Sequence, residues 1–294
     1  MESARLFYEH LTGSFIKLSF AVNPYDVCVF NRLSEEGVQQ TVCFHVDDVL
    51  VTCADANMND RLARELNEVY PNLKVHRGDV HDYLGMELIF NRDSATCDIS
   101  MCKYVDKLLA AHPPPKPGPH GIPSSPASDD LFKVTDDVMR LSEDNGKIFH
   151  TAVAKCLYLS RRRVDVAPAV AFLCTRVQTP TVEDQGKLNR LLGYLSSTKK
   201  WVMRIDGSSS DQVIAYVDAS YGVHMNRKSH TGVIISIGRG AVFTSSTKQK
   251  LVTKSSTEAE LVGLSDALSQ ILWSRYFMEA QGYPQKPAHI LQNN

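Results

Sequence analysis

The stretch TVCFHVDDVLVTC, residues 41–53, decides how the first half of this 294-residue chain folds. Two short apolar runs, 41–46 and 49–53, are separated only by Asp47 and Asp48. Two residues between two strand-like runs predict a tight hairpin with both carboxylates at its tip. Adjacent carboxylates suit metal-dependent phosphoryl or nucleotidyl transfer, which needs acids that hold divalent ions against phosphate oxygens. Aspartate is also a common turn residue, so the pair alone leaves a purely structural interpretation open.

The sequence on either side of this hairpin mixes helix and strand patterns. Apolar residues at helical spacing predict helices over 58–70 and 103–111, and 80–90 is typical of one strand. The segment HPPPKPGPHGIPSSP, residues 112–126, holds seven of the 13 prolines. Proline removes backbone donors and disfavours helix in the residue before it, so we expect an extended linker that continues through an acidic stretch to about residue 145.

A second run of elements follows the linker. The expected elements are helices over 149–177, 183–196 and 257–282, a three-strand meander over 213–220, 231–238 and 240–246, and a strand beginning at 288. In the last helix the predicted apolar stripe is Leu261, Leu264, Leu268, Ile271 and Leu272. Alternating strands and helices in both halves predict an α/β (α+β) fold.

Composition narrows the class of protein. The hydrophobic content of 43% is enough for a sizeable core, and the seven cysteines form no CxxC pair, which favours a reducing intracellular compartment, cytoplasm or nucleus. We expect a soluble protein without a signal peptide or membrane span. Residues 1–150 hold 14 Lys/Arg and 23 Asp/Glu, a net −9, whereas 151–294 hold 18 and 10, a net +8. The basic half could face a polyanion, and solvated helix faces explain the charges equally well.

Asp218 and Glu260 form a second candidate pair of acids. Asp218 lies within the apolar strand pattern YVDAS, and Glu260 lies at the start of the best helix pattern, in SSTEAEL. Two acids meeting over a sheet can bind metal ions that activate water. Capping explains Glu260 as well, because Thr257 and Glu260 fit a capping box, and Ser255 and Glu258 make an overlapping one.

Several ordered motifs resemble the Pol polyproteins of Ty1/copia-type retrotransposons. In the first half these are NPYDVCVFNRL (23–33), the Val-Asp-Asp hairpin, DYLGMEL (82–88) and ISMCKYVDKLL (99–109). In the second half they are 149–170, 180–201, YVDAS, RKSHTGVI (227–234) and STKQKLVTKSSTEAEL (246–261). The resemblance covers nearly the whole chain, and the agreement of ordered motifs is more specific than any one of them.

The resemblance implies an arrangement of domains. It implies the C-terminal part of a reverse transcriptase palm at 1–111, a linker at 112–145, a helical thumb or connection at 146–205 and a truncated RNase H-like domain at 206–294. It also implies RNA-directed DNA polymerase with RNase H activity on RNA–DNA hybrids. The partners would be an RNA template, a DNA primer, the hybrid and the rest of the polyprotein. Asp47, Asp48, Asp218 and Glu260 would be catalytic ligands of Mg²⁺, with Glu258 in helix capping or a supporting role.

The sequence departs from the family pattern at both sites. A third polymerase carboxylate is missing upstream, His45 replaces an aromatic residue, and Asn293 and Asn294 stand where the family continues into Asp-Asn. An amide lacks the negative charge of a carboxylate ligand. We therefore expect incomplete metal sites, and a non-catalytic transposon remnant that at most binds nucleic acid is the rival interpretation. Arg161–Arg163 could contact nucleic acid or be solvated, and Trp273 and Phe277 are expected in the core.

Overall fold

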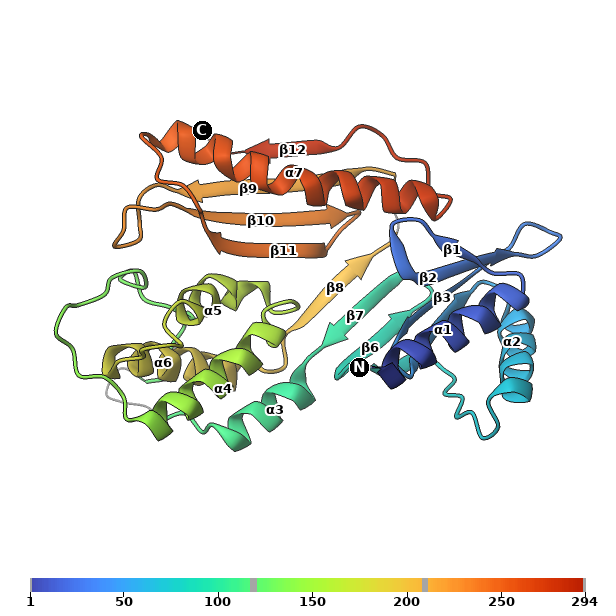
Figure 1. Ribbon diagram of the computed structural model, residues 1–294, viewed down its shortest axis with the longest axis horizontal. Coiled ribbons are helices and arrows are strands. Elements are labelled where there is room, and N and C mark those ends of the chain that lie inside the picture. The colour runs from blue at the N-terminus through green and yellow to red at the C-terminus, as the bar shows by residue number, and fades with distance from the viewer. Residues whose placement is uncertain (1, 117–120, 208–210, 293–294) are drawn as a thin grey trace.

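A computed structural model describes residues 2–116, 121–207 and 211–292 of the chain. Within these ranges the chain forms three four-stranded sheets, β1-β2-β3-β4, β5-β6-β7-β8 and β11-β10-β9-β12, together with helices (Figure 1). The elements are α1 (Glu2–Lys17), β1 (Ala21–Asn23), β2 (Asp26–Leu33), β3 (Gln39–His45), β4 (Asp48–Cys53), α2 (Ala56–Val69), β5 (Val80–Tyr83), β6 (Met86–Asn91), β7 (Thr96–Ser100), α3 (Cys102–Ala111), α4 (Glu143–Leu159), the 3₁₀ turn η1 (Val164–Val166), α5 (Ala167–Cys174), α6 (Val182–Thr198), β8 (Val202–Asp206), β9 (Val213–Ser220), β10 (His230–Ile237), β11 (Ala241–Lys248), α7 (Ser256–Ala280) and β12 (His289–Gln292). The mixed α+β class is confirmed.

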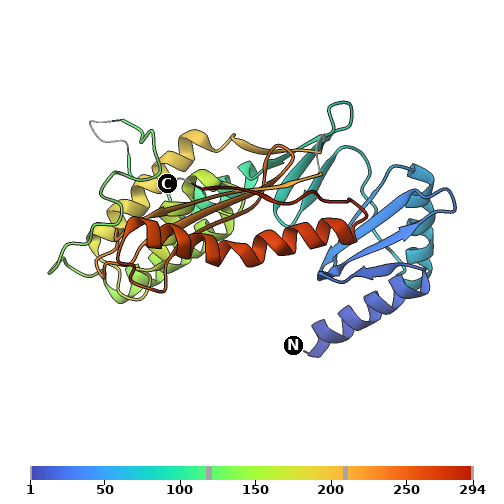
Figure 2. The same cartoon turned by 90° about the horizontal axis from the view of Figure 1, so that it is seen from above.

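The N-terminal sheet is a meander with α1 and α2 packed on it. Phe15 from α1, Phe30 and Phe44 from the strands and Leu62 from α2 are buried in one core. Asp55 caps α2 by accepting a hydrogen bond of 2.9 Å from the amide of Asn57, which stabilises the helix start. The predicted helix over 58–70 is confirmed. Figure 2 shows this sheet and its two helices at one end of the molecule.

The hairpin that carries the acidic pair is shifted by one residue from the prediction. His45 lies opposite Asp48 in the antiparallel register, so the two turn residues are Val46 and Asp47, and Asp48 begins β4. Val46 has φ 56°, a conformation that β-branched residues rarely adopt. The first position of such a turn favours glycine, so the backbone is strained beside the two acids.

The single strand predicted over 80–90 is wrong, because the segment is a hairpin of β5 and β6. Tyr83 lies opposite Met86, and the turn residues Leu84 and Gly85 have φ 50° and 72°. A two-residue turn with positive φ at both positions matches the twist of the flanking strands, which explains why the chain reverses here.

Helices α3 to α6 and the central sheet share one hydrophobic core. Buried residues of β6, β7 and α3 pack with Phe149, Leu173 and Leu195 of α4, α5 and α6. The helix predicted over 149–177 is interrupted after Leu159; η1 intervenes, and Pro168 lies in the first turn of α5, where the missing amide costs nothing. The predicted helix over 183–196 is confirmed by α6.

The proline-rich linker contains no helix or strand in its described part between α3 and α4. Residues 117–120 of this predicted linker lie outside the described residues. Leu131, in its acidic part, is buried in the core of the helical unit. Residues on both sides of the linker share that core, and the predicted domain boundaries stay a prediction.

The C-terminal sheet confirms the predicted meander, final helix and last strand. β9, β10 and β11 are antiparallel, and β12 adds to β9 in parallel. Helix α7 packs along one face, and of the predicted stripe only Ile271 is buried: Leu261 is 64% exposed, whereas Gly263 and Ala267 are buried. A Cβ on Gly263 would lie 3.1 Å from the Thr231 side chain, so small residues let the helix lie close to the sheet.

Two further properties follow from the described residues. None of their helices is long and apolar enough to span a bilayer. The seven cysteines, all within the described residues, are free thiols.

Candidate functional site

At the start of α7, Glu258 takes part in capping the helix and Glu260 does not. Ser255 is the N-cap, and its hydroxyl accepts a hydrogen bond of 3.2 Å from the amide of Glu258. The Glu258 carboxylate accepts one of 2.6 Å from the amide of Lys254. The capping box predicted from Thr257 and Glu260 is therefore wrong, and Glu258 has the capping role assigned to it. This leaves the Glu260 carboxylate available for another role.

Glu260 reaches the edge of β9 next to Asp218. One carboxylate oxygen, Oε1, accepts a hydrogen bond of 3.1 Å from the backbone amide of Ala219. The other oxygen accepts one of 3.2 Å from the Gln292 side chain, which also donates to the Glu260 carbonyl at 2.6 Å. The Glu260 carboxylate of α7 therefore contacts the residue that follows Asp218 in β9.

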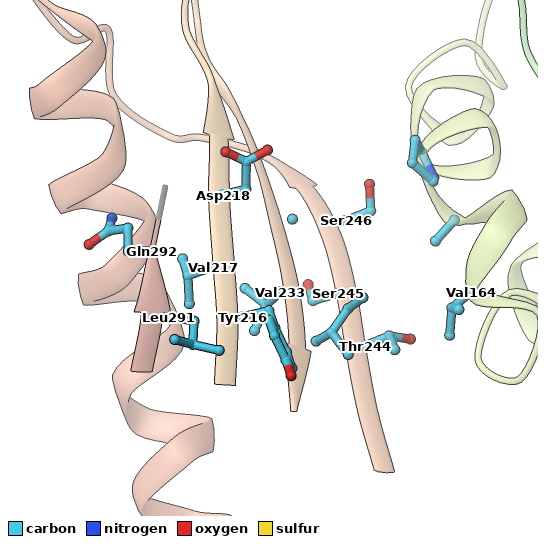
Figure 3. A pocket seen from close by; sticks show the side chains of 14 residues that line it. Val164, Tyr216, Val217, Asp218, Val233, Thr244, Ser245, Ser246, Leu291 and Gln292 are labelled. Atoms are coloured by element: carbon cyan, nitrogen blue, oxygen red, sulfur yellow. The ribbon is translucent and has the colours of Figure 1, made fainter. Parts of the chain in front are cut away.

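Asp218 lies in the middle of β9, between the buried residues Val217 and Ala219. The Val217 side chain lies on the face of the sheet that is covered by α7, because a Cβ on Gly263 would be 3.6 Å from it. Side chains alternate along a strand, so Asp218 projects from the opposite face of the sheet. There Asp218 lines a pocket of about 580 Å³ together with Tyr216, Leu291 and Gln292. Figure 3 shows α7 on one side of these strands and the helical segment that carries Val164 on the other.

The oxygen donors at this place are two carboxylates and one amide. Within the described ranges no group of three or more His, Cys, Asp or Glu side chains is close enough to hold a metal ion together. Asn293 and Asn294, which replace the expected third acid, lie outside the described residues. Mg²⁺ is commonly held by one or two carboxylates plus substrate phosphates and water, so Asp218 and Glu260 are each of the chemical type that this ion binds.

Asp47 and Asp48 occupy a different sheet, at the exposed tip of the β3–β4 hairpin. Burial raises the pKa of Tyr83 in β5, with Cys43 and Asp48 contributing in that order, so Asp48 lies near the neighbouring hairpin. No third acid of the described residues joins the pair. The structure does not bring the two candidate sites together.

Arg163, one of the predicted basic cluster, is an internal residue. Its guanidinium donates two hydrogen bonds to Asp165, at 2.9 and 2.7 Å, and two to the carbonyl and hydroxyl oxygens of Thr198, at 3.0 and 2.8 Å. Because it is only 4% exposed, neither solvation nor contact with nucleic acid describes it, and both interpretations are wrong for Arg163. Arg161 is exposed.

The placement of Trp273 in the core is also wrong. It is 38% exposed, stacks on Phe277 with ring centroids 5.1 Å apart, and donates its indole N–H to the Tyr25 carbonyl at 3.0 Å. Tyr276 stacks on Tyr25 at 5.7 Å. These aromatic residues therefore join α7 to the β1–β2 turn.

Sequence reasoning missed two groups near Asp218. Gln292 holds the Glu260 carboxylate, and no pattern of acids could indicate an amide. His224 and His230 lie 3.1 Å apart (Nε2 to Nδ1), and His230 contacts the Ser246 hydroxyl at 2.7 Å. Burial lowers the pKa of each imidazole to about 4, with a smaller contribution from Lys248 at His224 and from His224 at His230. Both rings are therefore neutral at pH 7.

Comparisons with known proteins identify relatives across most of the chain. The Retrovirus-related Pol polyprotein from transposon TNT 1-94 of Nicotiana tabacum is 26% identical over 278 residues, which are 93% of this chain and 21% of that protein. The Transposon Ty1-NL2 Gag-Pol polyprotein of Saccharomyces cerevisiae is 25% identical over 260 residues, 82% of this chain and 14% of that protein. An uncharacterized mitochondrial protein of Arabidopsis thaliana is 27% identical over 233 residues, 78% of this chain and 92% of that protein.

The chain spans about a fifth or less of the length of the two polyproteins. No family model and no solved structure matches it. The similarity to the two polyproteins nevertheless extends over most of the chain. The chain is a distant homologue of the Pol polyproteins of Ty1/copia-type retrotransposons.

Proposed function

We propose that residues 206–294 form an RNase H-like unit that binds RNA–DNA hybrids, with Asp218 and Glu260 as ligands of Mg²⁺. The observation that supports the proposal is the hydrogen bond from the Ala219 amide to Glu260, because Ala219 follows Asp218 directly in β9. The capping of α7 by Ser255 and Glu258 supports it, because Glu260 is not needed at the helix start. When bound, Mg²⁺ would lower the pKa of a bound water and stabilise charge on a phosphoryl group.

The residues around the acids have separate roles in this proposal. Gln292 and the Ala219 amide orient the Glu260 carboxylate, and Asp218 meets a phosphate backbone in the pocket between the sheet and the helical segment. The described residues supply two carboxylates, so a substrate phosphate would complete the coordination.

A polymerase role for Asp47 and Asp48 is a second proposal, supported by the hairpin that exposes both carboxylates. We expect no primer extension by this chain, because no third acid of the described residues joins Asp47 and Asp48 and two-metal transfer tolerates an incomplete ligand set poorly. Incorporation of nucleotides that disappears in Asp47→Asn would contradict this expectation.

Cleavage of the RNA strand in a labelled hybrid, with and without Mg²⁺, tests the nuclease proposal. Wild-type cleavage that is lost in Asp218→Asn and in Glu260→Gln, but kept in the capping variant Glu258→Gln, would support it. A direct measurement of Mn²⁺ binding by calorimetry checks the ligands independently of turnover. Absence of both cleavage and metal binding in the folded wild type would instead favour the non-catalytic remnant.

A further inference from the structure

A second pocket lies next to Asp218, between β11 and the helical unit. It has a volume of about 390 Å³. One wall comes from α4, α5 and the turn after α4, and includes Ser160 and Arg161. The other wall is the C-terminal half of β11, with Ser245, Ser246 and Lys248. The sequence separates Arg161 and Lys248 by 87 positions, so only the fold brings these two cations to one pocket.

In its described part, the lining of this pocket contains cations and hydroxyl groups but no acids. Of the described lining residues, two are cations, five carry hydroxyl groups and none is acidic. Neither Arg161 nor Lys248 forms an ion pair with any described acid, although many other cations of the chain do. Burial and the nearby Lys228 lower the pKa of Lys248, in that order. Positive charges crowded together without a counter-ion are destabilising, and a bound anion would relieve that repulsion.

The pocket adjoins the one that contains Asp218. The two share Ala167 and the segment 244–246 of β11. In the sheet register Asp218 lies opposite Gly232, and Gly232 lies opposite Ser246, so Lys248 is two strands across and two residues along. Strand and residue spacings place its Cα about 12 Å from that of Asp218.

We infer that Arg161 and Lys248, with the hydroxyl group of Ser246, bind a phosphodiester of the nucleic-acid strand that passes Asp218. The ligand is the backbone, not a base, because cations and hydroxyl groups recognise phosphate oxygens without reading sequence. This inference rests on the proposed hybrid binding and specifies where the helical unit takes part in it. It also divides the predicted basic cluster, since Arg161 faces this pocket and Arg163 is internal.

Fluorescence anisotropy of a labelled RNA–DNA hybrid, titrated with the full chain at several salt concentrations, tests the inference. Each cation that neutralises one phosphate contributes about 0.9 to the slope of log affinity against log salt. We expect Arg161→Gln and Lys248→Gln each to lower the slope by about that amount, which is about eightfold in affinity at 0.1 M salt. Lys250→Gln is the matched control, because Lys250 is exposed on the same segment and does not line the pocket. Circular dichroism of each variant verifies folding.

The outcomes separate this inference from the nuclease proposal. An unchanged slope in the double variant Arg161→Gln/Lys248→Gln, or an equal loss in Lys250→Gln, would overturn it. Inorganic phosphate that stabilises the wild type but not the double variant, with hybrid binding unaltered, would identify a free-phosphate site and also overturn it. If the slope falls as expected while the wild type never cleaves the hybrid, the backbone site stands and the nuclease proposal fails.

Discussion

Replacement of Arg163 by alanine should destabilise the helical unit strongly, although a surface arginine would cost almost nothing. The guanidinium is 4% exposed and donates hydrogen bonds to Asp165 and to both oxygens of Thr198. The rings of Tyr194 and Trp201 lie 5.8 and 5.5 Å from its central carbon. Truncation removes all of these interactions at once and leaves the Asp165 carboxylate without its counter-ion.

The magnitude follows from the geometry. Removing one partner of a buried ion pair costs about 3–5 kcal/mol. The Asp165 side chain is 28% exposed and keeps its hydrogen bond of 2.8 Å from the Tyr194 hydroxyl, so we expect the lower end, about 3 kcal/mol. Arg163→Lys keeps the charge but not the paired hydrogen bonds, and should cost roughly half as much.

Acid pH supplies an independent signature. Burial raises the pKa of Asp165, but the hydrogen bonds and charge of Arg163, with the Tyr194 hydroxyl, outweigh burial and the pKa lies below its ordinary value of 3.8. The unfolded chain therefore binds this proton more readily, so the stabilisation is present above pH 3.8 and is lost as pH falls through the lower folded value. This part of the acid sensitivity should shrink in Arg163→Ala.

Urea unfolding at pH 7, followed by fluorescence in a Trp273→Phe background, measures the effect locally, because Trp201 is then the single tryptophan and lies beside Arg163. Arg161→Ala is the matched control and should change the free energy of unfolding by less than about 0.5 kcal/mol. A cost for Arg163→Ala below about 1 kcal/mol, or loss of hybrid binding at unchanged stability, would refute the structural role.

Three other perturbations test separate features. Val46→Gly should raise the free energy of unfolding by about 1 kcal/mol in urea titrations, because glycine adopts φ 56° without strain; a loss of stability would contradict the strained turn. Gly240→Ala should cost at least about 2 kcal/mol in the same assay, since its Cβ would lie 2.2 Å from the Arg204 carbonyl oxygen at φ 114°, and a neutral result would exclude that close approach. The neutral pair His224 and His230 should make the fold less stable as pH falls from 6.5 towards 4, because the imidazoles of the unfolded chain take up protons first. The contribution of His230 alone should lower the free energy of unfolding by about 2 kcal/mol between pH 7 and 5. Urea titrations of His230→Gln should show a smaller decrease over the same pH range.

The sequence predicted most elements because their patterns are local, and it failed where packing decides. The leucines of α7 mark a helix correctly, but hydrophobic periodicity ignores that Gly263 and Ala267 fit closest to the sheet. The β3–β4 turn was displaced by one residue because the apolar runs do not determine which residue lies opposite His45.

At the candidate site, too, local motifs could be recognised in the sequence and tertiary contacts could not. Asp218 and Glu260 could be named from motifs, whereas the contact through the Ala219 amide depends on where α7 crosses the sheet. Arg163 was grouped with its charged neighbours because Thr198, which binds it, is 35 positions away. Gln292 carried no signal, since an amide is not part of a pattern of acids.

The parallel pairing of β12 with β9 has a consequence for the order in which the protein assembles. The N-terminal meander closes through neighbouring hairpins, which can form soon after synthesis. In contrast, Ala215 pairs with Ile290, 75 positions later, and Gln292 reaches Glu260 only once that strand is in place. At about 5–20 residues per second, the ribosome needs several seconds to deliver residues 289–292 after β9 has emerged. During that interval the strand that carries Asp218 has a bare edge, so it is then most exposed to pairing with another chain.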